Sequence, residues 1–206
     1  NNYPYPVVPD DHCESPMEAY QDISSFLLAI CKNLSKTPET LRIFDPYFCE
    51  GRMKERLNSL GFKTVYNEKK DFYESICSNM LPEFDVLITN PPYSGDHMER
   101  LLRFCTGDQC NKPWFLLLPN YVYTKDYYAN IFGGESVKKS TGKAHHGHSA
   151  SPHQQQQTEG AVRKPFYVTP AGTRRYMYTT PKGRRQEKSA KYTSPFPTFW
   201  YCQAYE

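Results

Sequence analysis

The 206-residue chain has no run of apolar residues approaching the ~20 that a membrane-spanning helix needs. It also lacks, at its first residues, the charged and apolar regions of a secretory signal peptide. We therefore expect an intracellular protein that does not contact membranes, with nucleus and cytoplasm left open. The first residue is Asn1, so we expect a segment of a longer protein in which flanking domains or a partner subunit are possible.

Cysteines in a metal-binding or disulfide pattern are also absent. The seven cysteines are scattered along the chain, and an odd, dispersed set in a domain of this size is typical of reduced thiols. Cys105 and Cys110 are close in sequence, but no matching Cys/His pair follows at the spacing of a zinc site. We expect no metal.

The composition suits one domain spanning residues 1–206, with 38% apolar residues and 17 tyrosines. Residues 1–16 are rich in proline and should be extended. From about 133 to 162 the chain is rich in Gly, Ser, His and Gln, and its histidines have no neighbouring cysteine or carboxylate. That composition predicts a disordered insertion rather than a metal site.

Helices and strands are expected to alternate through the first 118 residues. Apolar spacing predicts helices at 17–34, 52–60, 71–80 and 96–104 and strands at 41–48, 63–67, 84–89 and 114–118. Ser15 is the expected N-cap of the first helix and Gly61 the expected C-cap of the second. The alternation predicts an α/β fold with a mostly parallel sheet, helices on both faces, and ligands at the carboxyl ends of the strands.

Three more strands are expected at the far edge of this sheet, at 166–169, 176–179 and 199–202. The last two could pair in antiparallel fashion across the basic loop 181–194. The sheet should therefore have an antiparallel edge.

The stretch 84–89 is an apolar strand that leads directly into Asn90-Pro91-Pro92-Tyr93. Two prolines fix the backbone just beyond the strand, so the Asn90 side chain and a proline carbonyl can present two acceptors in one direction. An exocyclic amine has two N–H donors. Binding both would direct the nitrogen lone pair towards an electrophile, and the Tyr93 ring can stack on a flat substrate.

This segment resembles the (Asn/Asp/Ser)-Pro-Pro-(Tyr/Phe) motif of class I S-adenosylmethionine-dependent amino-methyltransferases. Members of that family methylate adenine N6, guanine N2 or a glutamine amide. The resemblance implies a Rossmann-like sheet, S-adenosylmethionine as cofactor, and Asn90, Pro91, Pro92 and Tyr93 as the catalytic residues. It covers roughly residues 10–132 and 163–204.

A second segment, from Ile43 to Gly51, resembles the cofactor loop of the same family, Asp-Pro-x-x-Gly-x-Gly. A turn of small residues lets the backbone approach the methionine part of the cofactor, and the helix N-terminus behind it favours a carboxylate. Cys49 stands where the family often has glycine, so the shape of this loop is open to question. The resemblance assigns four residues to the cofactor: Asp45, Pro46, Tyr47 and Gly51.

Four further cofactor residues follow from the resemblance: Glu68 for the ribose hydroxyls, Asp71 and Phe72 for the adenine, and Tyr20 beside the N-terminal stretch 12–16. The alternatives are a solvated charge run for Glu68 and Asp71 and ordinary core packing for Phe72 and Tyr20. Residues 68–83 are too few for a full strand-helix-strand unit. We expect the sheet to lose or shrink one of the family's seven strands.

Basic residues are concentrated near the C-terminus. Between Arg163 and Lys191 there are nine basic residues and one acidic residue, whereas the rest of the chain has 16 basic and 21 acidic residues. A basic face on an acidic body indicates phosphate contact, although a hairpin with charged loops is an equal alternative. The nucleic-acid-binding candidates are Arg174, Arg175, Lys182, Arg184 and Arg185.

These patterns predict an S-adenosylmethionine-dependent N-methyltransferase acting on an exocyclic amine of nucleic acid, chiefly adenine N6 in RNA or DNA. One alternative keeps the chemistry and makes the substrate a protein glutamine amide. The other is a catalytically silent methyltransferase fold that binds RNA or a partner subunit, for which the replaced glycine at Cys49 is the main support.

Overall fold

The computed structural model describes residues 11, 13–133, 162–179, 191–193 and 196–204. Its first half alternates helix and strand in the predicted order. The elements are α1 (Met17–Asn33), β1 (Ile43–Phe44), α2 (Arg52–Ser59), β2 (Val65–Tyr66), α3 (Phe72–Cys77), β3 (Val86–Thr89), α4 (His97–Thr106) and β4 (Trp114–Pro119). Each of these four helices ends within three residues of its expected bounds.

The second half adds two short helical segments and four strands: the 3-10 helix η2 (Asn120–Thr124), α5 (Asp126–Phe132), β5 (Phe166–Val168), β6 (Met177–Thr179), β7 (Lys191–Thr193) and β8 (Thr198–Gln203). Neither η2 nor α5 was expected from the sequence. The insertion expected at about 133–162 falls almost wholly outside the described residues, and so do residues 1–10 and 12 of the extended lead-in expected at 1–16.

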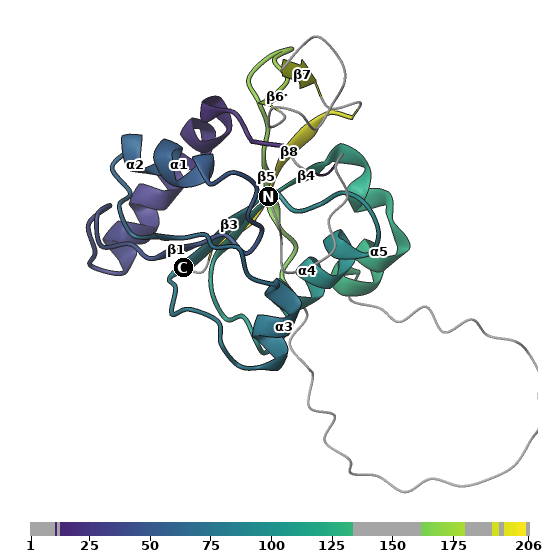
Figure 1. The fold of residues 1–206 in the computed structure, drawn as a ribbon. Coiled ribbons are helices and arrows are strands. Elements are labelled where there is room, and N and C mark those ends of the chain that lie inside the picture. The colour runs from purple at the N-terminus through teal and green to yellow at the C-terminus, as the bar shows by residue number, and fades with distance from the viewer. Residues whose placement is uncertain (1–10, 12, 134–161, 180–190, 194–195, 205–206) are drawn as a thin grey trace, which may run out of the picture.

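The main sheet has six strands in the order β2-β1-β3-β4-β8-β5 (Figure 1). The neighbours among β2, β1, β3 and β4 run parallel, whereas β8 is antiparallel to both β4 and β5. The prediction of an α/β fold with a mostly parallel sheet and an antiparallel edge is confirmed. Within the described residues this sheet has six strands, in line with the expectation that one of seven is lost or shrunken.

Helices cover both faces of the sheet, with α1 and α2 on one side and α3, α4 and α5 on the other (Figure 1). Side chains of a strand point alternately to opposite faces, so each central strand contributes to both cores. In β3, for example, Val86 and Ile88 belong to the α1–α2 core and Leu87 to the other. Both faces are therefore buried, which explains why the central strands are apolar throughout.

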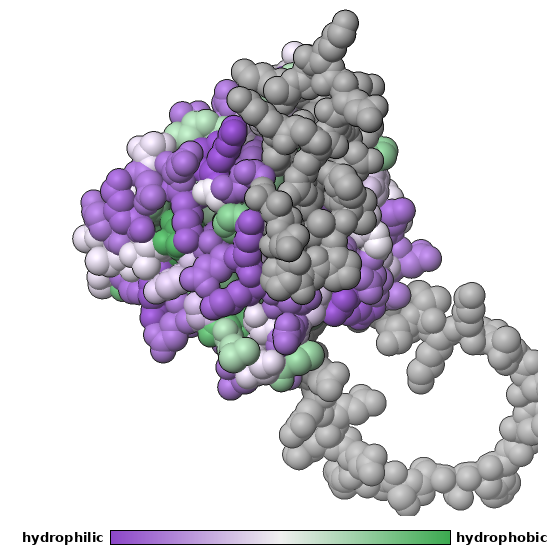
Figure 2. Space-filling view, viewed as in Figure 1, coloured by the Kyte–Doolittle hydropathy of each residue, from purple (hydrophilic) through white to green (hydrophobic). Residues whose placement is uncertain are grey.

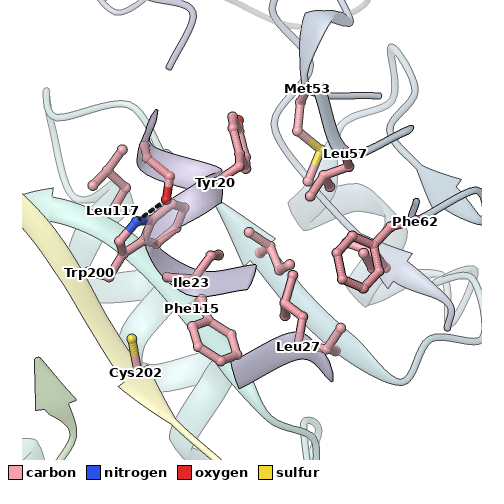
Figure 3. Packing of buried hydrophobic residues seen from close by; sticks show 14 of the residues in the cluster. Tyr20, Ile23, Leu27, Met53, Leu57, Phe62, Phe115, Leu117, Trp200 and Cys202 are labelled. Carbon is pink, nitrogen blue, oxygen red and sulfur yellow. Dashed lines mark hydrogen bonds between the residues drawn. The ribbon is translucent and has the colours of Figure 1, made fainter. Parts of the chain in front are cut away.

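Helix α1 is amphipathic and covers the sheet with Ala19, Ile23 and Leu27, all fully buried (Figure 3). The indole Nε1 of Trp200 in β8 donates a 2.8 Å hydrogen bond to the Ala19 carbonyl, which ties the helix to the sheet. Polar residues cover most of the outer surface over α1 and α2 (Figure 2). No helix among the described residues is long and apolar enough to cross a membrane.

The N-cap prediction for α1 was wrong. Pro16 occupies the N-cap position with extended backbone angles, and no side chain caps the helix. Ser15 is one residue too early to reach the free N–H groups of the first turn, and its side chain is buried at the site described below. Gly61 does follow the end of α2 with a φ of 98°, as its C-cap prediction requires.

β1, β2 and β3 are shorter than expected, whereas β4 is one residue longer. Just before β1 and β3, side-chain hydrogen bonds add to the backbone bond from Asp85 N–H to the Arg42 carbonyl. The Asp85 carboxylate accepts hydrogen bonds from the Arg42 backbone at 2.8 Å, the Arg42 guanidinium at 3.0 Å and Lys36 at 2.5 Å. Burial alone would raise the pKa of Asp85, but the hydrogen bonds from Arg42 and Lys36 lower it to about 2. This cluster lies before β1 and β3, at the amino ends of the strands.

The predicted pairing of the last two strands was also wrong. β6 pairs with β7, in a separate two-stranded sheet, and β7 lies within the stretch that was expected to be a loop. β8 cannot accept β6, since its two edges are already occupied by β4 and β5. The β6–β7 pair packs on the α1–α2 core through Tyr176 and Tyr178.

Candidate active site

Three polar residues follow three parallel strands and meet at one edge of the sheet. Asp45 follows β1, Asn67 follows β2, and Asn90 follows β3. The carboxyl ends of parallel strands form the usual ligand site of an open α/β sheet. All three line a single cavity, so the fold brings together the two segments singled out in the sequence.

Asp45 is a buried carboxylate with only 6% of its surface exposed. Its Oδ1 accepts hydrogen bonds from the Thr89 hydroxyl at 2.5 Å and from the Tyr47 backbone N–H at 3.0 Å. Burial raises the pKa of Asp45 to about 7, against the lowering effect of these hydrogen bonds, and the nearby Glu14 carboxylate adds to the rise. Because Thr89 immediately precedes Asn90, this bond also links the ends of β1 and β3.

Two cavities flank Asp45. The larger has a volume of about 250 Å³, and its lining includes Pro46, Asn67, Glu68 and Phe72. The smaller is about 20 Å³, and it is lined in part by Tyr20, Tyr47, Gly51 and Asn90. Asp45 and Asn67 line both, so a ligand that fills the two cavities would pass across these side chains.

The loop between Asp45 and Gly51 is held by side chains from other segments. Asn67 Nδ2 donates to the carbonyls of Asp45 at 3.2 Å and Tyr47 at 3.3 Å. Glu14 Oε1 accepts from the Glu50 N–H at 2.8 Å, and its other oxygen pairs with Arg56 at 3.4 Å. These bonds hold residues 45–51 as a turn, and a movement of the turn would have to break them.

Gly51 is required in this turn by its backbone. Its φ of 82° lies in the left-handed region, and an added Cβ would come within 3.3 Å of the Phe48 ring. Phe48 and Cys49 are bulkier than the small residues of the family's loop. Burial, together with Glu14, raises the pKa of the Cys49 thiol, which keeps it neutral. Cys49 lines the small cavity beside Gly51, whereas Phe48 does not.

The Asn90–Tyr93 segment turns sharply, with Pro91 buried and the other three residues half-buried. The Tyr93 hydroxyl donates towards Asn90 Oδ1 at 2.7 Å and the Leu117 carbonyl at 3.2 Å. The expected acceptor, Asn90 Oδ1, therefore already has a partner within its own motif. A carbonyl oxygen has two lone pairs, so one remains for a substrate N–H.

Among the residues assigned to adenosine, Glu68 and Phe72 line the larger cavity, whereas Asp71 does not. Asp71 is the N-cap of α3, and its Oδ1 accepts from the N–H groups of Tyr73 at 2.8 Å and Glu74 at 3.0 Å. Glu68 pairs with exposed Lys70 at 2.8 Å, which lowers its pKa. Asp71 thus has a structural role, while Glu68 remains accessible.

Tyr20 and Tyr47 both line the smaller cavity. Tyr20 is 4% exposed, lines the smaller cavity and packs against Trp200, and burial raises its pKa. The Tyr47 hydroxyl lies 2.8 Å from that of Tyr73, which in turn lies 3.2 Å from His97 Nδ1. Burial raises the pKa of Tyr47 as well. Both phenols are therefore neutral walls of the site.

The basic candidates are only partly described. Arg174 is held by Asp22 of α1, with bonds of 2.6 and 2.7 Å, so its guanidinium is already engaged. Arg175 is exposed. Lys182, Arg184 and Arg185 lie outside the described residues, and so does most of the basic loop that contains them.

Sequence reasoning did not assign a role to three side chains that shape the site. Asp11 contacts the backbone after Pro92, Glu14 holds the Gly51 turn, and Asn67 bridges the two cavities. Glu14 and Asn67 lie next to the recognised segments and could have been found there. Asp11 lies 82 positions before Tyr93 in the sequence, and no local pattern indicates a contact between residues so far apart.

No group of three or more potential metal ligands occurs in the part of the chain that the structure describes. Comparisons of the chain with protein-family models, with curated proteins and with solved structures found no match in any of the three.

Proposed function

We propose that the protein is an S-adenosylmethionine-dependent methyltransferase that transfers a methyl group to a planar exocyclic amine, adenine N6 of nucleic acid. The observation that carries the proposal is the meeting of Asp45 and Asn90 in one cavity. They belong to the two segments that resemble the family, and the hydrogen bond between Thr89 and Asp45 joins those segments.

The residues around Asp45 suit the adenosine part of the cofactor. The larger cavity presents Pro46 and Phe72 as apolar walls and Glu68 as an accessible carboxylate for ribose hydroxyls. The buried Asp45 carboxylate, whose pKa is raised to about 7, would be stabilised by a cationic ligand. Both features agree with an adenosyl sulfonium compound.

The methionine part of the cofactor would have less room than its adenosine part. The cavity beside Gly51 is about 20 Å³, well below the ~300 Å³ at the lower end for ligand pockets. The turn at residues 46–51 must shift for the whole cofactor to enter. S-adenosylmethionine, once bound, supplies the electrophilic methyl group that an amine nitrogen can attack.

The protein's own contribution to the reaction is positioning. Asn90 Oδ1 and the Pro91 carbonyl would accept the two N–H bonds of the amine, which orients its lone pair. A conjugated amine is a poor nucleophile, so contacts that strengthen as the nitrogen becomes tetrahedral lower the barrier. Tyr93 keeps the Asn90 amide in one orientation through its hydroxyl.

Nucleic acid is favoured over a protein amide by the excess of basic residues between Arg163 and Lys191. The engaged guanidinium of Arg174 weakens that support, whereas exposed Arg175 retains it. Binding to an RNA oligonucleotide should weaken steeply with added salt, and Arg175→Ala should lower the slope of log K against log salt by about one. A glutamine-containing peptide should show little salt dependence.

The small cavity at Gly51 specifically favours a second candidate, a silent methyltransferase fold that binds RNA or a partner subunit. In that case Cys49, which lines the small cavity beside Gly51, closes the cofactor site permanently. The two candidates differ in one measurable property, which is affinity for the cofactor.

Isothermal titration of S-adenosylmethionine into the protein and its Asp45→Ala variant tests the proposal. We expect micromolar binding by the wild type and loss of detectable binding by the variant. Asp108→Ala, in a turn after the far end of α4, is the matched control and should bind like the wild type. Asn90→Ala should bind cofactor normally and fail to transfer a methyl group to RNA, DNA or peptide.

A folded wild-type protein that shows no heat of binding would overturn the proposal for the chain acting alone. Thermal unfolding of each variant, followed by circular dichroism, provides the necessary check on folding. Equal binding by the wild type and Asp45→Ala would mean that the site lies elsewhere.

A further inference from the structure

The Asp11 carboxylate reaches the loop that carries the proposed catalytic residues. Its Oδ1 accepts hydrogen bonds from the backbone N–H groups of Tyr93 at 3.1 Å and Ser94 at 3.3 Å. Its Oδ2 accepts a hydrogen bond from the Ser94 hydroxyl. Three donors of one loop therefore converge on a single side chain that is 82 positions away in sequence from Tyr93.

The loop has few other means of fixing its own backbone. Pro91 and Pro92 have no N–H, so Tyr93 and Ser94 supply the first backbone donors after Asn90. Gly95 follows with a φ of 59°, a conformation that favours glycine and leaves the chain free to turn. Asp11 holds the two donors between the rigid prolines and this flexible glycine.

The contact is transmitted to Asn90 through Tyr93. Fixing the Tyr93 backbone fixes the point from which its ring extends, and the ring hydroxyl is bonded to Asn90 Oδ1 at 2.7 Å and to the Leu117 carbonyl at 3.2 Å. Hydrogen bonds to an ionised carboxylate are roughly twice as strong as neutral ones, so the restraint is firm. No substrate atom needs to touch Asp11 for this effect.

We propose that Asp11 is a positioning residue, which sets the orientation of Asn90 by holding the backbone of Tyr93 and Ser94. The expected effect of Asp11 on kcat rests on the proposed methyltransferase function. Its expected effect on the backbone amides of Tyr93 and Ser94 does not. Both can be measured separately in the full chain.

Amide hydrogen exchange at Tyr93 and Ser94, followed by NMR of the ¹⁵N-labelled protein, tests the restraint directly. Asp11→Ala should speed exchange at these two amides by about tenfold or more, because their acceptor is lost. Asp11→Asn keeps an acceptor oxygen for both N–H groups and should stay within about threefold of the wild type. Asp108→Ala is the control for removing a carboxylate away from the loop.

Methyl-transfer kinetics on the same proteins test the consequence. Asp11→Ala should lower kcat by about 10- to 100-fold while the Kd for S-adenosylmethionine changes less than about twofold, since a misplaced group loses rate rather than cofactor affinity. Asp11→Asn should recover most of the rate.

Unchanged amide exchange in Asp11→Ala would overturn the proposal, and so would equal losses of kcat in Asp11→Ala and Asp11→Asn. A wild-type protein without any methyl transfer would defeat the proposed function, and the exchange experiment would still decide the role of Asp11. A general loss of protection across α1 and β3 in Asp11→Ala would indicate a purely structural residue and would also count against the proposal.

Discussion

The two loops at the carboxyl edge of the sheet differ in how their polar groups are satisfied. After β1, Asp45 is deeply buried, and burial raises its pKa to about 7. After β3, Asn90 is half-buried and already accepts a hydrogen bond from Tyr93 within its own loop. The first loop thus holds a charge that a cationic ligand would stabilise, whereas the second holds an acceptor that must be shared with a substrate.

The difference separates two tasks at one edge of the sheet. Binding strength for a charged ligand should depend on Asp45, and the rate of transfer should depend on Asn90. Substitutions in the Asp45 loop should leave the rate of transfer nearly unchanged. Substitutions in the Asn90 loop should leave the affinity for the charged ligand nearly unchanged.

The largest effect is expected for Asn90→Ala. Loss of the acceptor should lower methyl transfer by about 100- to 1,000-fold, or about 3 to 4 kcal/mol, comparable with removal of one transition-state hydrogen-bond partner in other enzymes. Transfer of a labelled methyl group to nucleic acid measures it. Asn120→Ala is the matched control, because Asn120 follows β4 and lines neither cavity. A cofactor Kd that rises in parallel with the loss of rate would contradict the separation of tasks.

Asp45→Asn should change the pH dependence of stability. In the wild type the folded-state pKa of Asp45, about 7, lies above the unfolded value, so the folded protein binds more protons. Stability is therefore highest below pH 4 as far as Asp45 is concerned, and it falls as the pH rises through 7. Between pH 5 and 8 the loss should be about 2 to 3 kcal/mol.

Urea denaturation of the wild type and Asp45→Asn at several pH values from 5 to 8 checks this expectation. Subtracting the two profiles isolates Asp45, because the other titrating groups are common to both proteins. If the free energy of unfolding changed with pH in the same way in both proteins, Asp45 would not be desolvated. The proposed difference between the Asp45 and Asn90 loops would then disappear.

Gly51→Ala should destabilise the first loop by about 2 kcal/mol, since a side chain is strained at positive φ and would press on Phe48. Gly61→Ala is the control, with a φ of 98° and only the Pro38 side chain at 3.7 Å. Gly61→Ala should lower the free energy of unfolding by about 1 kcal/mol, because only its backbone conformation is strained. Thermal unfolding measures both variants, and S-adenosylmethionine affinity should fall only in Gly51→Ala.

The smallest effect on stability is expected for Tyr93→Phe. Losing the hydroxyl removes the bonds to Asn90 and Leu117 and should lower stability by about 1 kcal/mol. It also frees the Asn90 side chain, so kcat should fall by about 10- to 100-fold, as in Asp11→Ala, while the KM for the amine substrate stays the same or decreases. Tyr123→Phe, at a side chain that is 53% exposed, should be neutral in denaturation and kinetics. A higher KM in Tyr93→Phe would show that the hydroxyl itself contacts the substrate.

Local patterns were sufficient for the parallel half of the fold. The apolar stretches that became β3 and β4 are buried on both faces, and the spacing of Ile23 and Leu27 marks the buried side of α1. Such signals depend on periodicity within one element. The convergence of Asp45 and Asn90 also followed from the sequence, because parallel strands must end at the same edge.

The remaining errors came from interactions that periodicity does not encode. The partner of β6 depended on β8 having both edges occupied, which is a property of the whole sheet. Asp71 was assigned to the cofactor, and the structure shows that it also caps α3, a role that its residue type already permitted. Asp11 and the small cavity at Gly51 became evident only from three-dimensional packing.

The hydrogen bond from Trp200 to Ala19 spans 181 positions and fixes an order of events during synthesis. Helix α1 emerges from the ribosome early, but its docking partner in β8 emerges last among the strands of the main sheet. Until then the apolar face of α1 lacks the strand against which Ala19 and Tyr20 pack. Tyr20, which lines the smaller cavity, therefore gains its packing partner Trp200 only after β8 has been made.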